Sequence, residues 1–175
     1  MNRRGNGEYV KELFAKLRRE IPGLVLRTSL ITGLPGEGEV EFAQLCDFLK
    51  EYKLERVGAF AFSPEEGTRA AEMEYPDTEI AKRAEQVAEI QSRIMDDYNE
   101  SCVGQVMQVL CEGYDPDEDS YYGRTYADSP DIDGKIWFTA EKHIKTGDFV
   151  DVHVVDTYDG ELVGVLEEEY NDDCE

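Results

Sequence analysis

The sequence predicts two structural units, an α/β unit followed by a small closed β-barrel. Residues 24–42 read as a buried strand, a glycine–proline turn and the start of a helix, which is half of a βαβ unit. After Val103 the pattern changes to short β segments separated by turn residues. The charge changes as well, because residues 101–175 contain 4 Lys and Arg against 20 Asp and Glu, which is −16 of the chain's net charge of −22. We therefore expect the second unit to be a strongly acidic all-β module.

Residues 24–31 form the strand around which the α/β unit is organised. Their apolar run is nearly continuous, as in a strand that is covered on both faces of a parallel sheet. Gly33, Pro35 and Gly36 end this strand, and Glu37 follows where the positive end of a helix dipole favours a carboxylate. Ligands of α/β folds bind at the carboxyl ends of the strands, so the end of this strand is the first candidate site.

Three helices and a second strand complete the α/β unit. Apolar residues at helical spacing predict helices over residues 8–20 and 39–52, and a second strand over residues 56–63. A polar connection follows over residues 64–77. A long helix is then predicted from Asp77 or Thr78, either of which is a suitable N-cap, to Tyr98. The face that this helix buries is expected to consist of Ile80, Ala84, Val87, Gln91, Ile94 and Tyr98.

Short strands dominate the acidic module. They are predicted over residues 105–111, 121–126, 135–139, 148–157 and 161–166, with turn pairs such as Asp133-Gly134 and Asp159-Gly160 between them. Five strands in so short a segment are typical of a small closed barrel of the OB-like kind. The strongly acidic residues 167–175 are expected to be disordered.

Composition excludes several classes of function. No run approaches the roughly 18 apolar residues of a membrane span, and the polar amino terminus is not a signal peptide. The four cysteines lack metal-ligand spacing, and His143 and His153 have no Cys or His partner at such a spacing. We therefore expect a soluble cytoplasmic protein that has no membrane contact and no metal site.

Four motifs carry a family resemblance. They are MNRRG at residues 1–5, LRTSLITGLPGE at 26–37, VGAFAFSPEEGT at 57–68 and GRTYADSPDIDG at 123–134. In this order they resemble the radical S-adenosylmethionine methylthiotransferases, and within them the branch that modifies a ribosomal protein. The resemblance covers nearly the whole chain. It implies that residues 1–75 are the carboxy-terminal part of a radical-SAM (β/α) barrel, residues 76–100 a connecting helix, residues 101–168 a TRAM β-barrel domain and residues 169–175 an acidic tail.

The resemblance also implies an activity for the full-length enzyme. Such an enzyme uses S-adenosylmethionine and two iron–sulfur clusters to insert a methylthio group at the β-carbon of an aspartate in small-subunit ribosomal protein twelve. Three cysteines spaced CxxxCxxC hold the radical-generating cluster, because iron in such clusters prefers thiolate ligands. This chain lacks that motif. We therefore expect a carboxy-terminal part with no catalytic residue of its own, which binds neither the cofactor nor a cluster in isolation.

Cofactor-facing residues are expected at the strands of the partial barrel. An arginine within an apolar strand is costly unless it is paired, and the fork of Arg27 suits the carboxylate of S-adenosylmethionine. A structural ion pair with a barrel carboxylate explains the same residue equally well. Thr28, Ile31 and Ser63 are the other candidates for the pocket wall, although strand residues more often serve packing.

The acidic module is expected to dock a basic protein. The substrate-docking candidates are Arg124, Tyr126, Asp128, Asp131 and Asp133. An alternative is that these aspartates only stabilise turns through hydrogen bonds to the backbone.

Nucleic acid is the competing partner of the acidic module. Its aromatic residues could form a stacking platform for RNA, as in a tRNA-modifying relative. A surface with 4 cations and 20 carboxylates repels phosphate, so nucleic acid is the less favoured partner. A non-catalytic acidic adaptor for a basic protein is a further alternative.

Overall fold

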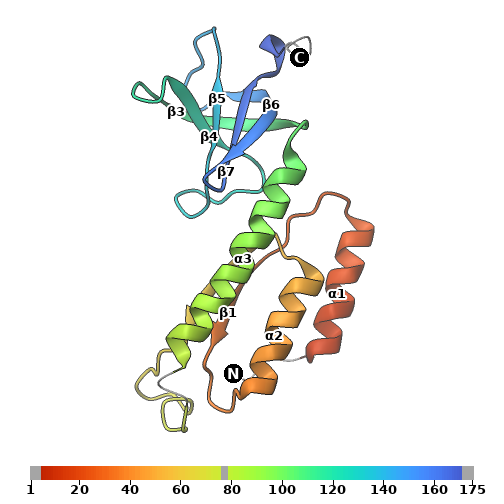
Figure 1. Ribbon diagram of the computed structural model, residues 1–175, viewed down its shortest axis with the longest axis vertical. Coiled ribbons are helices and arrows are strands. Elements are labelled where there is room, and N and C mark those ends of the chain that lie inside the picture. Colours follow the sequence, from red (N-terminus) through yellow and green to blue (C-terminus); the bar gives the residue numbers. More distant parts are fainter. Residues whose placement is uncertain (1–4, 76–78, 171–175) are drawn as a thin grey trace. The chain divides into compact units, whose positions relative to one another are not determined.

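The computed structural model describes residues 5–75 and 79–170 and divides into two compact units, residues 1–94 and residues 95–175. We refer to them as the α/β unit and the barrel unit (Figure 1). The boundary falls within the long helix α3 (Ile80–Cys102).

The α/β unit packs helices on one face of a two-stranded parallel sheet. Its elements are α1 (Gly7–Glu20), β1 (Arg27–Thr32), α2 (Glu39–Tyr52), β2 (Arg56–Ala61) and the first part of α3. In the sheet Arg27 is opposite Arg56 and Thr32 is opposite Ala61. The core consists of Phe42, Leu49, Val87 and Ile94 from α2 and α3, packed against Leu30, Val57 and Ala59 of the strands.

Two details of the predicted strand 24–31 are wrong. β1 begins at Arg27, because the Leu26 N–H donates instead to the buried Glu55 carboxylate at 2.8 Å. The strand is also covered on one face only within the described residues. α2 and α3 cover the Leu30 side, whereas Ile31 on the other side is 38% exposed and its neighbour Phe60 is 56% exposed.

The long helix agrees with its predicted stripe. Ile80, Val87, Gln91 and Ile94 are buried, and the Gln91 amide donates to the Leu54 carbonyl at 2.9 Å. The helix extends to Cys102, beyond the predicted end. The predicted N-caps Asp77 and Thr78 lie outside the described residues. Among the described helices none has a stretch long and apolar enough to cross a membrane.

The barrel unit is a closed five-stranded barrel, which confirms the predicted fold class. Its strands are β3 (Val106–Asp115), β4 (Ser120–Arg124), β5 (Ile136–Thr139), β6 (Phe149–Tyr158) and β7 (Glu161–Leu166), in the order β3-β4-β5-β7-β6. The β5–β7 pair is parallel and the other pairs are antiparallel. Alternate side chains fill the interior, as the strand period requires. The most deeply buried are Val109, Cys111, Ile136, Phe138, Val152 and Val154.

The start of the acidic segment after β7 is ordered, which corrects the expectation of disorder from residue 167. Glu167–Glu169 form a short 3-10 helix, η1. The Glu169 carboxylate accepts the Glu141 N–H at 2.7 Å, and Glu168 pairs with Lys142 at 2.8 Å. These carboxylates therefore satisfy polar groups of the loop before β6. Residues 171–175 lie outside the described residues.

Candidate functional site

The turn after β1 is fixed to α3 by a buried arginine. Gly33 has φ +77°, and a Cβ added there would lie 2.5 Å from the Ile80 side chain, so glycine is required. Glu37 accepts hydrogen bonds from the Gly33 N–H and from Arg83 Nη1, both at 2.9 Å. Arg83 is only 4% exposed, and it also donates to the Glu37 carbonyl at 2.9 Å and to Glu39 at 2.6 Å. The turn of the GLPGE motif is thus held by the bond between Gly33 and Glu37 and by the bonds that Arg83 donates to Glu37 and Glu39.

The electrostatics of this cluster favour the charged arginine. Burial alone would lower the pKa of Arg83, but the hydrogen bonds to Glu39 and Glu37 outweigh burial, so its pKa is raised. The guanidinium also lies over the Phe42 ring, 5.1 Å from its centroid. Sequence reasoning missed Arg83, because its partners lie more than 40 residues earlier in the chain. The role of this cluster is to hold the strand end in place.

The uncovered face of the sheet contains a hollow of about 740 Å³ near the carboxyl ends of the strands. It is lined mainly by apolar side chains, with two hydroxyls: Ser29, Leu30, Ile31, Leu34, Pro35, Phe60, Ala61, Phe62, Ser63, Ala70 and Met73. The structure therefore brings together two of the four predicted cofactor residues, Ile31 and Ser63. A wall of this composition suits binding of a partly apolar ligand.

The other two predicted cofactor residues lie elsewhere. Arg27 shares the uncovered face with Ile31, since side chains alternate along a strand, but it begins β1. Ile31 lies four positions further along the strand, about 13 Å away. Thr28 follows the alternation to the helix-covered side, on which Leu30 packs. The role of each as a cofactor ligand stays a prediction.

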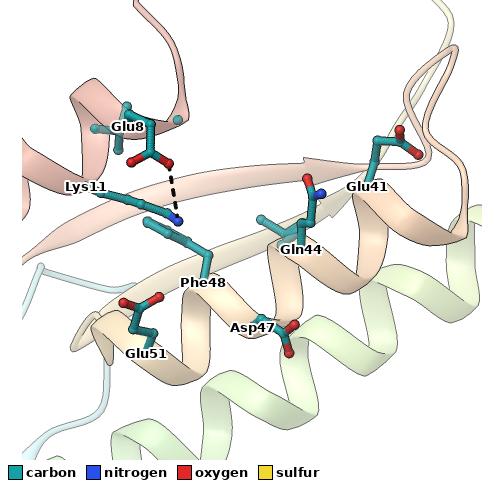
Figure 2. Close-up of a pocket in the computed structure, with 10 residues that line it drawn as sticks. Glu8, Lys11, Glu41, Gln44, Asp47, Phe48 and Glu51 are labelled. Atoms are coloured by element: carbon teal, nitrogen blue, oxygen red, sulfur yellow. Dashed lines mark ion pairs between the residues drawn. The ribbon is translucent and has the colours of Figure 1, made fainter.

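A groove of about 660 Å³ lies between α1 and α2 of the α/β unit (Figure 2). Figure 2 shows Glu8 and Lys11 of α1 reaching toward each other, and their charged groups lie 3.6 Å apart. The α2 carboxylates Glu41, Asp47 and Glu51 are exposed. Solvated charges and an exposed ion pair of this kind contribute little binding energy. We assign no chemistry to this groove.

In the barrel unit two of the three predicted docking aspartates, Asp128 and Asp133, stabilise turns. Asp128 accepts the Thr125 N–H at 3.0 Å and its hydroxyl at 2.6 Å, and Asp133 accepts the Ser129 N–H at 2.6 Å. These bonds are those expected if the aspartates stabilise turns. A docking role for the same residues stays a prediction. Asp131 is exposed with φ +59°.

The two other docking candidates differ in exposure. Arg124 Nε is 2.8 Å from Glu112 Oε1, so this cation is paired within the barrel. Tyr126 is 70% exposed. Of the five predicted docking residues, Tyr126 and Asp131 are exposed and the other three are half-buried.

The aromatic residues of the barrel do not form one platform. Tyr121 and Phe138 are buried and stack inside, with ring centroids 5.5 Å apart. Tyr122 and Trp137 lie on the outside with centroids 5.6 Å apart, and the Lys135 ammonium lies over both rings. Strand alternation, inward at 121 and outward at 122, would have shown this split from the sequence.

Comparison with known proteins now identifies the relatives. A family profile described as a TRAM domain matches residues 103–166, which include the whole barrel from β3 to β7. A protein of Clostridium botulinum (strain Langeland) named "Ribosomal protein uS12 methylthiotransferase RimO" is 44% identical over 168 residues, 95% of this chain. Proteins of the same name from Acetivibrio thermocellus and Caldanaerobacter subterraneus are 42% and 43% identical over 166 residues.

The chain is homologous to the carboxy-terminal part of RimO methylthiotransferases. This confirms the resemblance inferred from the four motifs. The chain spans 37% of the length of each of these relatives.

The described residues do not fit the iron–sulfur clusters that kinship with RimO implies. No group of three or more His, Cys, Asp or Glu side chains that could hold a metal ion occurs among them. Cys46, Cys102 and Cys111 lie on α2, α3 and β3, and burial is the largest cause that raises the pKa of the Cys46 and Cys111 thiols. A raised pKa disfavours the thiolate that a cluster needs. Cys174 lies outside the described residues.

Proposed function

We propose that this chain provides one wall of the S-adenosylmethionine pocket and the substrate-docking module of a ribosomal protein uS12 methylthiotransferase. The observation that carries the proposal is 44% identity, over 95% of the chain, to proteins named for that activity. The reaction class is transfer of a methylthio group to an aspartate, and the substrate is a ribosomal protein. Since ribosomes are assembled in the cytoplasm, we expect the protein there.

The hollow on the uncovered sheet face supports the cofactor part of the proposal. Ile31 and Phe60 offer apolar surface for the adenosine moiety, and Ser63 offers a hydroxyl at the same end of the sheet. Arg27 lies on this face at the start of β1, so it would reach the cofactor carboxylate only if the molecule extended along the strand. S-Adenosylmethionine would supply the radical that abstracts hydrogen, and the clusters that start this chemistry would be held outside the described residues.

The charge of the barrel unit supports a basic protein as the partner. Three of its four cations are engaged: Arg124 pairs with Glu112, Lys142 pairs with Glu168, and Lys135 lies over the Tyr122 and Trp137 rings. The excess of carboxylates repels phosphate and attracts lysine and arginine. A tRNA substrate and a non-catalytic adaptor role are the competing functions.

A chimera tests the proposal. In a full-length RimO relative, this chain replaces the segment to which it is homologous, and the products are analysed by mass spectrometry with uS12 and tRNA as competing substrates. We expect a methylthio group on an aspartate of uS12 and none on tRNA. Modification of tRNA, or binding of uS12 without any modification, would favour one of the competing functions.

Ile31 provides the matched variant for the cofactor wall. In the same chimera, Ile31→Glu places a carboxylate in the apolar hollow, and we expect the Kd for S-adenosylmethionine to rise by about tenfold or more. The control is Val40→Glu on α2, which introduces the same group at a side chain that is 66% exposed. An unchanged Kd in Ile31→Glu would show that the hollow is not part of the cofactor site.

A further inference from the structure

The outer face of β3 and β6 is an apolar surface that the predicted docking residues do not include. The two strands are antiparallel neighbours, with Val106 opposite His153 and Leu110 opposite Phe149. Inward residues such as Val109 and Val152 are fully buried, so the intervening side chains face outward. The outward set, which we call the β3–β6 face, is Val106, Gln108, Leu110, Phe149, Asp151, His153 and Val155.

Large apolar side chains are exposed on the β3–β6 face. Phe149 is 66% exposed, Val106 is 49% exposed and Val155 is 38% exposed. Phe149 and Val155 are six residues apart on β6, about 20 Å along the strand, and Asp151 lies between them. An exposed sheet face with several large apolar side chains is typical of an interaction site.

Charge on the barrel is distributed unevenly around this face. β3, β6 and β7 contain no lysine or arginine at all. Arg124 on β4 lies opposite Leu110 at one edge of the face, but its Nε is 2.8 Å from Glu112 Oε1, so it is paired. Lys135 precedes β5, which is two strands away from β3. Asp151 is on the face. Two further exposed aspartates flank it: Asp148 immediately precedes β6, and Asp156 lies on β6. His153 is held by Glu167 at 3.1 Å and stacks on the Tyr170 ring. The face is therefore apolar at both ends and negative between them.

We propose that the β3–β6 face docks an extended segment of the basic protein partner, with a lysine or arginine placed between two apolar side chains. The apolar side chains would pack on Phe149 and on the Val106–Val155 end, and the cation would reach Asp151. Burial of a large aromatic side chain supplies the affinity, and the charge pair supplies selectivity for a basic partner. This inference rests on the proposed function, because it locates the docking surface of that same module.

Binding of purified uS12 to the whole chain, measured by calorimetry, tests the location. Two variants alter the face, Phe149→Ser and Asp151→Lys. Two matched variants alter exposed residues outside it: Tyr126→Ser, at one of the predicted docking residues, and Glu118→Lys, in the turn between β3 and β4. All four positions are exposed, so each variant is expected to keep the thermal unfolding midpoint of the parent.

We expect each face variant to weaken binding about tenfold or more, and each matched variant to change it less than about threefold. Loss of binding in Tyr126→Ser with full binding in Phe149→Ser would overturn the inference and leave the proposed function intact. Equal loss in both lysine variants, with none in Phe149→Ser, would also overturn it, because only net charge would then matter. No binding by the parent chain would overturn both. Binding of tRNA that is lost in Phe149→Ser would show that the face takes nucleic acid, and would contradict the inference.

Discussion

Phe138→Ala is expected to destabilise the barrel unit by about 3–5 kcal/mol, a large part of the stability of a domain this size. Phe138 is 1% exposed and stacks on Tyr121 within the interior. It lies on β5, which joins β4 to β7 and so closes the barrel. Removing the ring leaves a cavity that the surrounding strands, fixed by their hydrogen bonds on both sides, cannot collapse to fill.

Urea denaturation followed by tryptophan fluorescence measures this effect. Trp137 is the single tryptophan of the chain and precedes Phe138 on β5, so its fluorescence reports on the barrel unit. The matched control is Phe149→Ala, the same chemical change at a side chain that is 66% exposed, for which we expect a loss within about 0.5 kcal/mol. Equal losses in the two variants would show that Phe138 is not part of a packed core.

Arg83→Met is expected to destabilise the α/β unit by about 3 kcal/mol. The Glu37 carboxylate is 11% exposed, and without Arg83 it would be left buried with the Gly33 N–H among its remaining partners. Breaking a buried ion pair on one side costs about 3–5 kcal/mol, since the remaining charge is uncompensated. Because the pKa of Arg83 is raised, the guanidinium stays protonated, and its contribution would be lost only at a pH above that of any working buffer.

Helix content during urea denaturation, followed by circular dichroism, measures the effect of Arg83→Met. The double variant Arg83→Met with Glu37→Gln removes both charges, and we expect it to recover part of the lost stability. Glu39→Ala is the control, because the Glu39 side chain is 84% exposed and its pair with Arg83 is screened by water. A loss in Glu39→Ala as large as that in Arg83→Met would contradict the central role of Glu37.

Helical spacing and strand alternation were sufficient to predict most of the elements. The spacing of Ile80, Val87, Gln91 and Ile94 predicts the buried stripe of α3, and the structure buries these residues. The five β segments are found within a few residues of their predicted bounds. Their closure into a barrel follows from length and number, because strands this short bury little surface unless the sheet closes on itself.

Tertiary contacts explain what the sequence did not reveal. Arg83 lies beside the buried stripe of α3, and only the position of Glu37 in the folded chain makes its burial favourable. The hydrogen bond from Leu26 to Glu55 delays the start of β1 and thereby places Arg27 at the beginning of the strand. The β3–β6 face was within reach of sequence reasoning, because alternation along residues 149–155 already places Phe149 and Asp151 on one side.

Binding of this chain to purified uS12 across a salt series, with tRNA as the control, is the decisive test of the acidic barrel as a docking module. We expect binding to uS12 that weakens steadily as salt is raised, since carboxylates of the barrel unit would pair with basic residues of the partner. We expect no binding to tRNA at any salt concentration. Binding to tRNA, or equal binding to both, would contradict the claim that the acidic barrel is a docking module for a basic ribosomal protein.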